Sequence, residues 1–203
     1  MKKIIFTLTT IVAVVIGTAN FTYATDKNIT QTTLTNVGNI NKIEVHGNVE
    51  VYVSNGVKDA VTVNNNYYAE SAFVQDVDGV LRIASYKAEK LIVFVTASDL
   101  RTIAAYDNAT VKSDGKLSLI SLDVNLYNNA YAGLKLDNYT ANITVNDQAK
   151  ADLSGNITEY NLTYSVGSSV NRTLLVADNA TENKVTPKVE LKQKHISDDI
   201  AVL

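Results

Sequence analysis

Apolar and polar residues alternate along most of the chain between residues 40 and 185. A period of two predicts β-strands, because successive side chains of a strand point to opposite faces of a sheet. The alternation is regular over residues 43–53 and returns in shorter form at residues 61–63 and 81–83, whereas residues 91–95 are apolar throughout. Asn, Asp and Gly separate these segments, as is typical of tight turns. The pattern predicts an all-β protein.

The second half of the chain repeats the alternation in units of about 20 residues. Its anchors are Asp107, Asn128 and Asp147, spaced 21 and 19 residues apart, and Val166 follows as a degenerate fourth. Positions two and four residues from each anchor share one face of a strand and are mostly apolar. These columns are Ile103, Val124, Ile143 and Leu162; Ala105, Leu126, Val145 and Tyr164; Ala109, Ala130, Ala149 and Ser168; and Val111, Ala132, Ala151 and Val170.

A period near 20 is typical of solenoids, in which each unit stacks on the last. We therefore predict a right-handed parallel β-helix of short coils of about 20 residues, with a less regular N-terminal cap. The Asp and Asn anchors are expected at corners, because these residues tolerate the backbone of a sharp turn. Alanine beside a corner fits a narrow interior. The alternative is a β-sandwich, for which more Asn-Gly or Asp-Gly turns are expected.

The N-terminus has the layout of a secretory signal peptide over residues 1–24. Lys2 and Lys3 precede an apolar run at residues 4–17, and small residues at Thr22 and Ala24 suit a cleavage site. An uncleaved N-terminal anchor is the alternative. We predict an exported protein with a lead-in at residues 25–37, one domain at residues 38–186 and a tail at residues 187–203. No transmembrane segment is expected in the mature chain.

Charge and composition argue against several kinds of site. Two of the 18 basic residues lie in the predicted signal peptide, which leaves 16 against 21 acidic residues, a formal charge of −5. Nucleic-acid binding needs a basic face and is therefore not expected. The chain has no cysteine, and neither His46 nor His195 stands at metal-ligand spacing. The fragment "DVDG" at residues 76–79 lacks the Glu that completes a calcium loop, because Lys87 stands at its twelfth position. We predict no metal and no cofactor.

Catalytic motifs are missing as well, since the chain contains no nucleophile elbow and no phosphate loop. The candidate site is instead a binding surface made of Tyr106, Tyr127, Asn129 and Tyr131. Tyr106 and Tyr127 occupy the same outward column, and exposed tyrosines bind sugars or partner proteins. The alternative is that these tyrosines only reflect the strand preference of the residue.

Three stretches together resemble a known family: "INKIEVHGNVEVYVSNG" at residues 40–56, "LRIASY" at residues 81–86 and "VFVTASDLRTIAAYDNATV" at residues 93–111. They are similar to the auto-transporter adhesin, head GIN domain family. The resemblance implies a bacterial domain of unknown function, mostly from Bacteroidetes, with a β-helix-like fold.

We therefore expect a secreted or envelope-exposed binding domain, adhesin-like and non-catalytic, located in the periplasm, on the cell surface or outside the cell. Its expected partner is a glycan or a cell-surface protein. A carbohydrate-active enzyme and a passive structural protein of the envelope remain the alternatives. The oligomeric state is not predicted.

Overall fold

The computed structural model describes residues 31–34, 37–64 and 73–186, and all regular elements within them are β-strands. The all-β prediction is confirmed. The predicted signal peptide and tail lie outside the described residues, as does most of the lead-in. The strands are β1 (Gln31–Thr33), β2 (Lys42–Gly47), β3 (Val49–Asn55), β4 (Ala60–Asn64), β5 (Phe73–Val77), β6 (Val80–Ser85), β7 (Leu91–Ala97), β8 (Thr102–Ala105), β9 (Thr110–Ser113), β10 (Leu117–Leu126), β11 (Tyr131–Val145), β12 (Lys150–Ser165) and β13 (Ser169–Val185).

The predicted right-handed parallel β-helix is wrong. The strands belong to one mixed sheet that curls into an open half-barrel. Eleven strands follow one another in the order β1-β4-β7-β3-β9-β11-β10-β8-β2-β6-β5, and β12 and β13 continue from β11. The pairs β1–β4, β4–β7 and β5–β6 are antiparallel.

Two features of the N-terminal half produce this mixed sheet. Asp78 and Gly79 both have positive φ, 53° and 78°, a combination typical of the type I′ turn that joins antiparallel strands. This turn makes β5 and β6 a hairpin. In addition, β2 lies between β6 and β8, and β3 lies between β7 and β9. In a simple winding of successive coils, the levels would follow one another in the order of the chain. The levels of this sheet do not.

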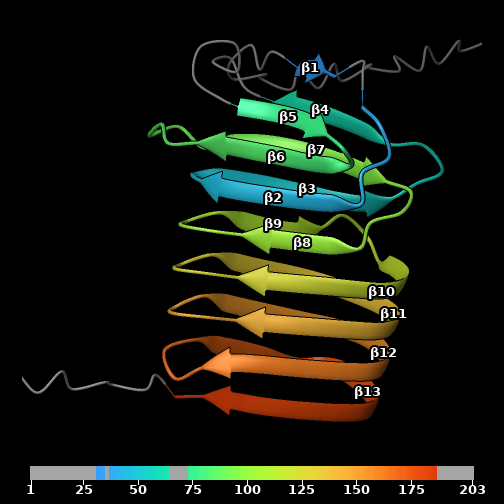
Figure 1. The fold of residues 1–203 in the computed structure, drawn as a ribbon, viewed down its shortest axis with the longest axis vertical. Helices are drawn as coiled ribbons and strands as arrows, with labels where there is room; N and C mark the ends of the chain where they lie inside the picture. Colours follow the sequence, from blue (N-terminus) through green and yellow to red (C-terminus); the bar gives the residue numbers. More distant parts are fainter. Residues whose placement is uncertain (1–30, 35–36, 65–72, 187–203) are drawn as a thin grey trace, which may run out of the picture.

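Two walls of parallel strands enclose the interior. The first wall contains β6, β2, β8 and most of β10, and the second contains β7, β3 and β9. The long strands β11, β12 and β13 belong to both walls and change wall at a bend (Figure 1). At this bend one residue of each strand has no paired partner in the neighbouring strand, and these residues stand at equivalent positions. We call these positions the bend column; they are Ile120, Tyr139, Thr158 and Asp178.

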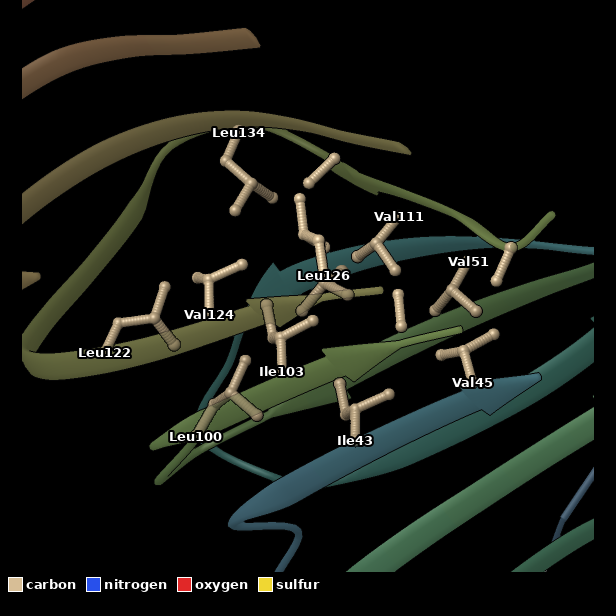
Figure 2. Close-up of a cluster of buried hydrophobic side chains, with 14 of the residues drawn as sticks. Ile43, Val45, Val51, Leu100, Ile103, Val111, Leu122, Val124, Leu126 and Leu134 are labelled. Atoms are coloured by element: carbon tan, nitrogen blue, oxygen red, sulfur yellow. The ribbon is translucent and has the colours of Figure 1, made fainter. Parts of the chain in front are cut away.

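The hydrophobic core lies between the two walls. Figure 2 shows Ile43, Ile103 and Val124 of the first wall together with Val51 and Val111 of the second, and all five side chains are fully buried. Burial of a side chain of this size stabilises the fold by about 1.5–3 kcal/mol. The same cluster extends through all levels from β2 to β12.

The columns predicted from the repeat are confirmed by the strand register. Val124 pairs with Ile103 on one side and with Ile143 on the other. Ala132 likewise pairs with Val111 and Ala151. The alanines after the turns, Ala109, Ala130 and Ala149, are fully buried, as expected for small residues beside a corner.

The last strand, β13, ends the core with charged side chains. The column that contains Ile143 and Leu162 continues to Glu182, and Arg172 forms an ion pair with that carboxylate. The next column ends at Lys184, whose ammonium lies 5.9 Å from the ring centroid of Tyr164. Charges at inward positions oppose the edge-to-edge association of strands.

Candidate functional site

The turns between the two walls form a column at the left of Figure 1. Gly47, Asp107, Asn128 and Asp147 all have positive φ there, between 55° and 79°, so the predicted anchors do stand at corners. Asp107 Oδ2 accepts a hydrogen bond from the N–H of Gly47 at 3.2 Å. Asn128 Oδ1 accepts one from the N–H of Asp107, also at 3.2 Å. Asp147 Oδ2 accepts from the N–H of Asn128 at 2.8 Å. These four residues, the turn column, hold neighbouring turns together.

Three aromatic rings stack directly before the turn column. The ring centroids of His46 and Tyr106 are 4.4 Å apart, and those of Tyr106 and Tyr127 are 4.9 Å apart, with interplanar angles of 2° and 4°. Both faces of Tyr106 are therefore covered by neighbouring rings, and burial raises the pKa of its hydroxyl. We call His46, Tyr106 and Tyr127 the ring stack. The central ring of the stack therefore has no free face.

The structure brings the two predicted tyrosines of the column together but separates the other two candidates from them. Asn129 is exposed in its turn, and its Nδ2 lies 3.5 Å from Asn108 Oδ1 in the turn of the neighbouring level. Tyr131 begins β11 on the second wall, where its hydroxyl donates a hydrogen bond to Asp152 Oδ2 at 2.7 Å. That hydrogen bond raises the pKa of Tyr131. We call the ring stack together with Asn129 and Tyr131 the turn surface.

His46 was missed as a member of this surface. It lies on β2, 60 residues before Tyr106, and reaches the stack only because β2 pairs with β8. The motif "VHGN" at residues 45–48 does place an aromatic ring before a turn residue, as "AYDN" does at residues 105–108. That likeness is the signal that could have identified it.

A second group of polar and aromatic residues lies on the outer face of the second wall, and the sequence did not indicate it. Glu50 accepts hydrogen bonds from Lys112 at 2.7 Å, Tyr52 at 2.7 Å and Lys90 at 3.2 Å. The Lys112 ammonium is the main cause that lowers the pKa of Glu50 to about 2. The rings of Tyr52 and Phe94 stack at 5.1 Å. The charges of this cluster are paired with one another, which gives it a structural role on the wall.

The bend carries a hollow of about 230 Å³, the bend pocket, at the side opposite to the turns. Most of its polar groups are amide, hydroxyl and carboxylate groups on neighbouring strands. The Asp137 carboxylate is paired with Lys116 at 2.8 Å. The lining residues are Asp137, Asn138, Asn156, Ile157, Thr158, Val176 and Asp178.

Asn138 is the unusual residue of this pocket. Its side chain is only 5 % exposed, and its Oδ1 accepts a hydrogen bond from the N–H of Leu119 at 3.2 Å. Its Nδ2 has no hydrogen-bond partner among the residues that the structure describes. The next residue, Tyr139, belongs to the bend column and is 60 % exposed.

Two further hollows flank the bend and the second wall. The larger, about 410 Å³, lies between residues 98–101 and 118–121, where Arg101 and Asp99 form an ion pair at 2.6 Å. β10 pairs with β8 only from Asp123 onward, so its first half has no strand partner on that side among the described residues. The smaller, about 260 Å³, lies beside Gly133 on the second wall.

His46 and the carboxylates form no metal site in the part of the chain that the structure describes. No group of three or more His, Cys, Asp or Glu side chains converges within residues 31–34, 37–64 and 73–186. His46 belongs to the ring stack, and its Nε2 lies 3.5 Å from Glu44 Oε1. His195 lies outside the described residues. Asp76 and Asp78 of "DVDG" belong to the β5–β6 hairpin.

A family model described as "Putative auto-transporter adhesin, head GIN domain" matches residues 39–186. The chain belongs to this family. The resemblance predicted from the sequence is confirmed, and head GIN domains are adhesin-like domains whose ligand is not known.

Two solved structures from Parabacteroides distasonis share the fold of this chain. A putative adhesin of Parabacteroides distasonis is 17 % identical in sequence, with a TM-score of 0.59 and coverage of 79 % of this chain and 80 % of that chain. A putative lipid binding protein of the same organism is 9 % identical, with a TM-score of 0.62 and coverage of 77 % and 78 %. At these identities the likeness shows the fold alone.

A search of curated protein sequences returns no relative of this chain. Within the described residues, no helix is long and apolar enough to span a membrane.

Proposed function

We propose that this head GIN domain is an exported, non-catalytic binding module that attaches to a cell-surface molecule through its turn surface. The observation that carries this proposal is the ring stack, in which one aromatic side chain of β2 and two that directly follow β8 and β10 stack next to the turn column. Aromatic side chains supply large contact areas at a small loss of conformational entropy. Membership of an adhesin family supports the same role.

The geometry of the ring stack favours a protein partner over a sugar at this surface. A sugar ring binds an aromatic side chain by lying against the face of the ring, and both faces of Tyr106 are already covered. The ring edges, the Tyr hydroxyls and the Asn129 amide supply donors, acceptors and apolar edges around the turns. Such a surface suits the polar and aromatic contacts of a protein interface.

The carboxylates near the turn surface already make hydrogen bonds within the fold, which favours a binding role over a catalytic one. Asp107 and Asp147 accept backbone N–H groups, Asp152 accepts the Tyr131 hydroxyl, and Glu50 is held by two lysines. Hydrolysis of a glycoside needs a pair of carboxylic groups left free to exchange protons. These carboxylates are engaged in structural hydrogen bonds instead.

The proposal is tested with an array that carries purified extracellular proteins and glycans, probed with the full exported chain. The double variant Tyr106→Ser/Tyr127→Ser removes two rings of the stack and is expected to weaken binding to the recognised protein by at least tenfold. A matched control is Tyr52→Ser/Phe94→Ser, which removes another stacked aromatic pair from the outer face of the second wall. The control is expected to bind like the parent.

Equal binding by the parent and the ring-stack variant would overturn the assignment of the turn surface. Circular dichroism and thermal unfolding of both double variants separate a loss of contact from a loss of fold. If neither array class retains the parent protein, the module is a passive structural component of the envelope.

A further inference from the structure

We infer that Asn55 is a modification site: it deamidates by attack of the Gly56 backbone nitrogen, and the fold prevents this reaction until the end of β3 opens. These two residues are the one Asn-Gly pair of the chain. Asparagine is among the thermolabile residues, and a following glycine has no side chain to hinder ring closure through its nitrogen. Asn55 ends β3 on the second wall, so the site is independent of the turn surface.

The reaction releases ammonia and consumes water. A bond forms between the Gly56 nitrogen, which loses its proton, and Asn55 Cγ, while the bond from Cγ to Nδ2 breaks and ammonia leaves. The product is a cyclic imide. Water then opens the imide at either carbonyl and leaves aspartate or isoaspartate at residue 55. Asn55 is exposed, so solvent supplies this water.

Hydrogen bonds hold the reacting groups on opposite sides of β3. The Gly56 N–H donates to the carbonyl of Ala97, at the end of β7, at 3.3 Å. The side-chain amide of Asn55 is bound on the other side, where Nδ2 donates to Ser118 O at 3.2 Å and Oδ1 accepts the Ser118 N–H at 3.1 Å. We call the two bonds between Asn55 and Ser118 the amide clamp. Ring closure therefore requires a local opening that breaks the amide clamp and the bond to β7.

The two sides follow from the strand order. β3 lies between β7 and β9, so its two edges face different neighbours. Ser118 belongs to the level of β9, because β9 and the start of β10 both pair with β11. The Gly56 N–H thus points to one neighbouring level and the Asn55 amide to the other.

The fold requires both residues of the labile pair. A Cβ at residue 56 would lie 2.3 Å from Cγ2 of Thr96, so a larger residue would have to displace that side chain. The Asn55 amide takes the place of a strand partner for the start of β10, which pairs with β8 only from Asp123 onward. An amide suits this role because it offers a donor and an acceptor side by side.

The modification is irreversible, because neither product can form the amide clamp again. Aspartate places a carboxylate oxygen where Nδ2 stood and has no donor for the Ser118 carbonyl. Isoaspartate has the same carboxylate and also inserts the side-chain carbon into the main chain. The start of β10 and the hollow between residues 98–101 and 118–121 are then held less firmly. Deamidation therefore accumulates with each opening of β3 and ages the domain at this edge.

The experiment incubates the full chain in mildly alkaline buffer, folded and unfolded in urea, and follows residue 55 by peptide mass spectrometry. Deamidation is expected to be at least tenfold slower in the folded protein. Ser118→Pro removes the N–H that donates to Asn55 and keeps the carbonyl, so the folded variant is expected to deamidate at least threefold faster than the parent. Ser118→Ala keeps both backbone groups and is expected to deamidate like the parent.

The consequence for the fold is measured with Asn55→Asp, which has the side chain of one product. This variant is expected to unfold at a lower urea concentration than the parent. Val57→Asp adds the same charge two residues later, at a fully exposed side chain, and is expected to unfold like the parent.

Each result decides the inference. Equal rates in the folded and the urea-unfolded parent would overturn it, as would an unfolded chain that does not deamidate at Asn55. A folded Ser118→Pro variant that reacts no faster than the parent would show that the amide clamp does not control the reaction. If circular dichroism shows that this variant does not fold, the comparison of folded and unfolded parent decides. Equal unfolding of Asn55→Asp and Val57→Asp would contradict the structural role of the clamp.

Discussion

The turn side and the bend side of the sheet are made from the same repeat, yet they differ in how completely their polar groups are satisfied. On the turn side, Asp107, Asn128 and Asp147 each direct an oxygen to a backbone N–H of the next turn. On the bend side, strand pairing is interrupted, and Asn138 Nδ2 lacks a partner among the described residues. Tyr160 Oη, close to the bend on β12, lacks one as well.

The difference suggests which side contributes more to the stability of the fold. A satisfied ladder of hydrogen bonds with rings packed face to face is specific and rigid, but its groups are already engaged. On the bend side, buried polar groups without a hydrogen-bond partner lower the stability of the fold. Substitutions on the two sides are therefore expected to change stability by different amounts, and in one case with opposite sign.

The largest loss is expected from Ala130→Leu on the turn side. Ala130 is fully buried directly after the Asn128 turn, where the two walls meet and the interior is narrow. Three additional carbon atoms overpack this corner at a cost of about 1–3 kcal/mol. Urea unfolding measures the change. Asn129→Ala, at the exposed neighbouring position, is the control and is expected to stay within about 0.5 kcal/mol. Equal losses would mean that the corner relaxes to admit the larger side chain.

The next loss is expected from Asn128→Ala, which breaks the turn column. The positive φ of 57° is unfavourable for alanine, and the N–H of Asp107 loses its acceptor. The free energy of unfolding is therefore expected to fall by about 1–2 kcal/mol. Asn128→Gly removes the same acceptor but tolerates the positive φ. It is therefore expected to unfold at a higher urea concentration than Asn128→Ala. The reverse order would show that the backbone at this corner is not strained.

The two sides also differ in how far the sequence predicts them. The turn column could be read from the sequence, because positive φ selects Asp and Asn at a fixed spacing and burial selects alanine two residues later. The bend could not, because Ile120, Tyr139, Thr158 and Asp178 share no chemistry that marks a bend. The mixed sheet was missed for a related reason. The hairpin turn at Asp78 and Gly79 is visible in the sequence, but the insertion of β2 between β6 and β8 depends on contacts between distant segments.

The proposed binding surface follows the same rule. Tyr106 and Tyr127 were placed in one column correctly because they occupy equivalent positions of the repeat. His46 joins them from outside the repeat, and the covered ring faces are a property of three-dimensional stacking that spacing alone does not give. The cluster around Glu50 combines β3, β7 and β9 with the loop before β7, so it too depends on tertiary pairing.

A smaller loss, which depends on pH, is expected from Glu50→Gln on the second wall. Hydrogen bonding to Lys112 lowers the pKa of Glu50 from 4.5 to about 2. The carboxylate therefore stabilises the fold above pH 4.5, and this contribution disappears as the pH falls toward 2. Because both lysines are at least 40 % exposed, the expected loss at neutral pH is only about 1 kcal/mol. Urea unfolding at pH 7 and pH 2.5 measures it. A difference between parent and variant that stays constant over this range would contradict the shift.

The smallest effect, and the one with opposite sign, is expected from Tyr160→Phe beside the bend. The Tyr160 ring is 1 % exposed, and its hydroxyl has no hydrogen-bond partner among the described residues. Removal of a buried hydroxyl that makes no hydrogen bond is expected to leave stability unchanged at pH 7 or to raise it by up to about 1 kcal/mol.

Burial also raises the pKa of this hydroxyl to about 12. Between pH 10 and 12 the unfolded chain therefore ionises while the folded protein does not, and the parent loses stability that the Tyr160→Phe variant keeps. Thermal unfolding at pH 7 and pH 11 measures both effects. A clear loss of stability at pH 7 would show that the Tyr160 hydroxyl does make a hydrogen bond. The polar groups of the bend would then be as fully hydrogen-bonded as those of the turns.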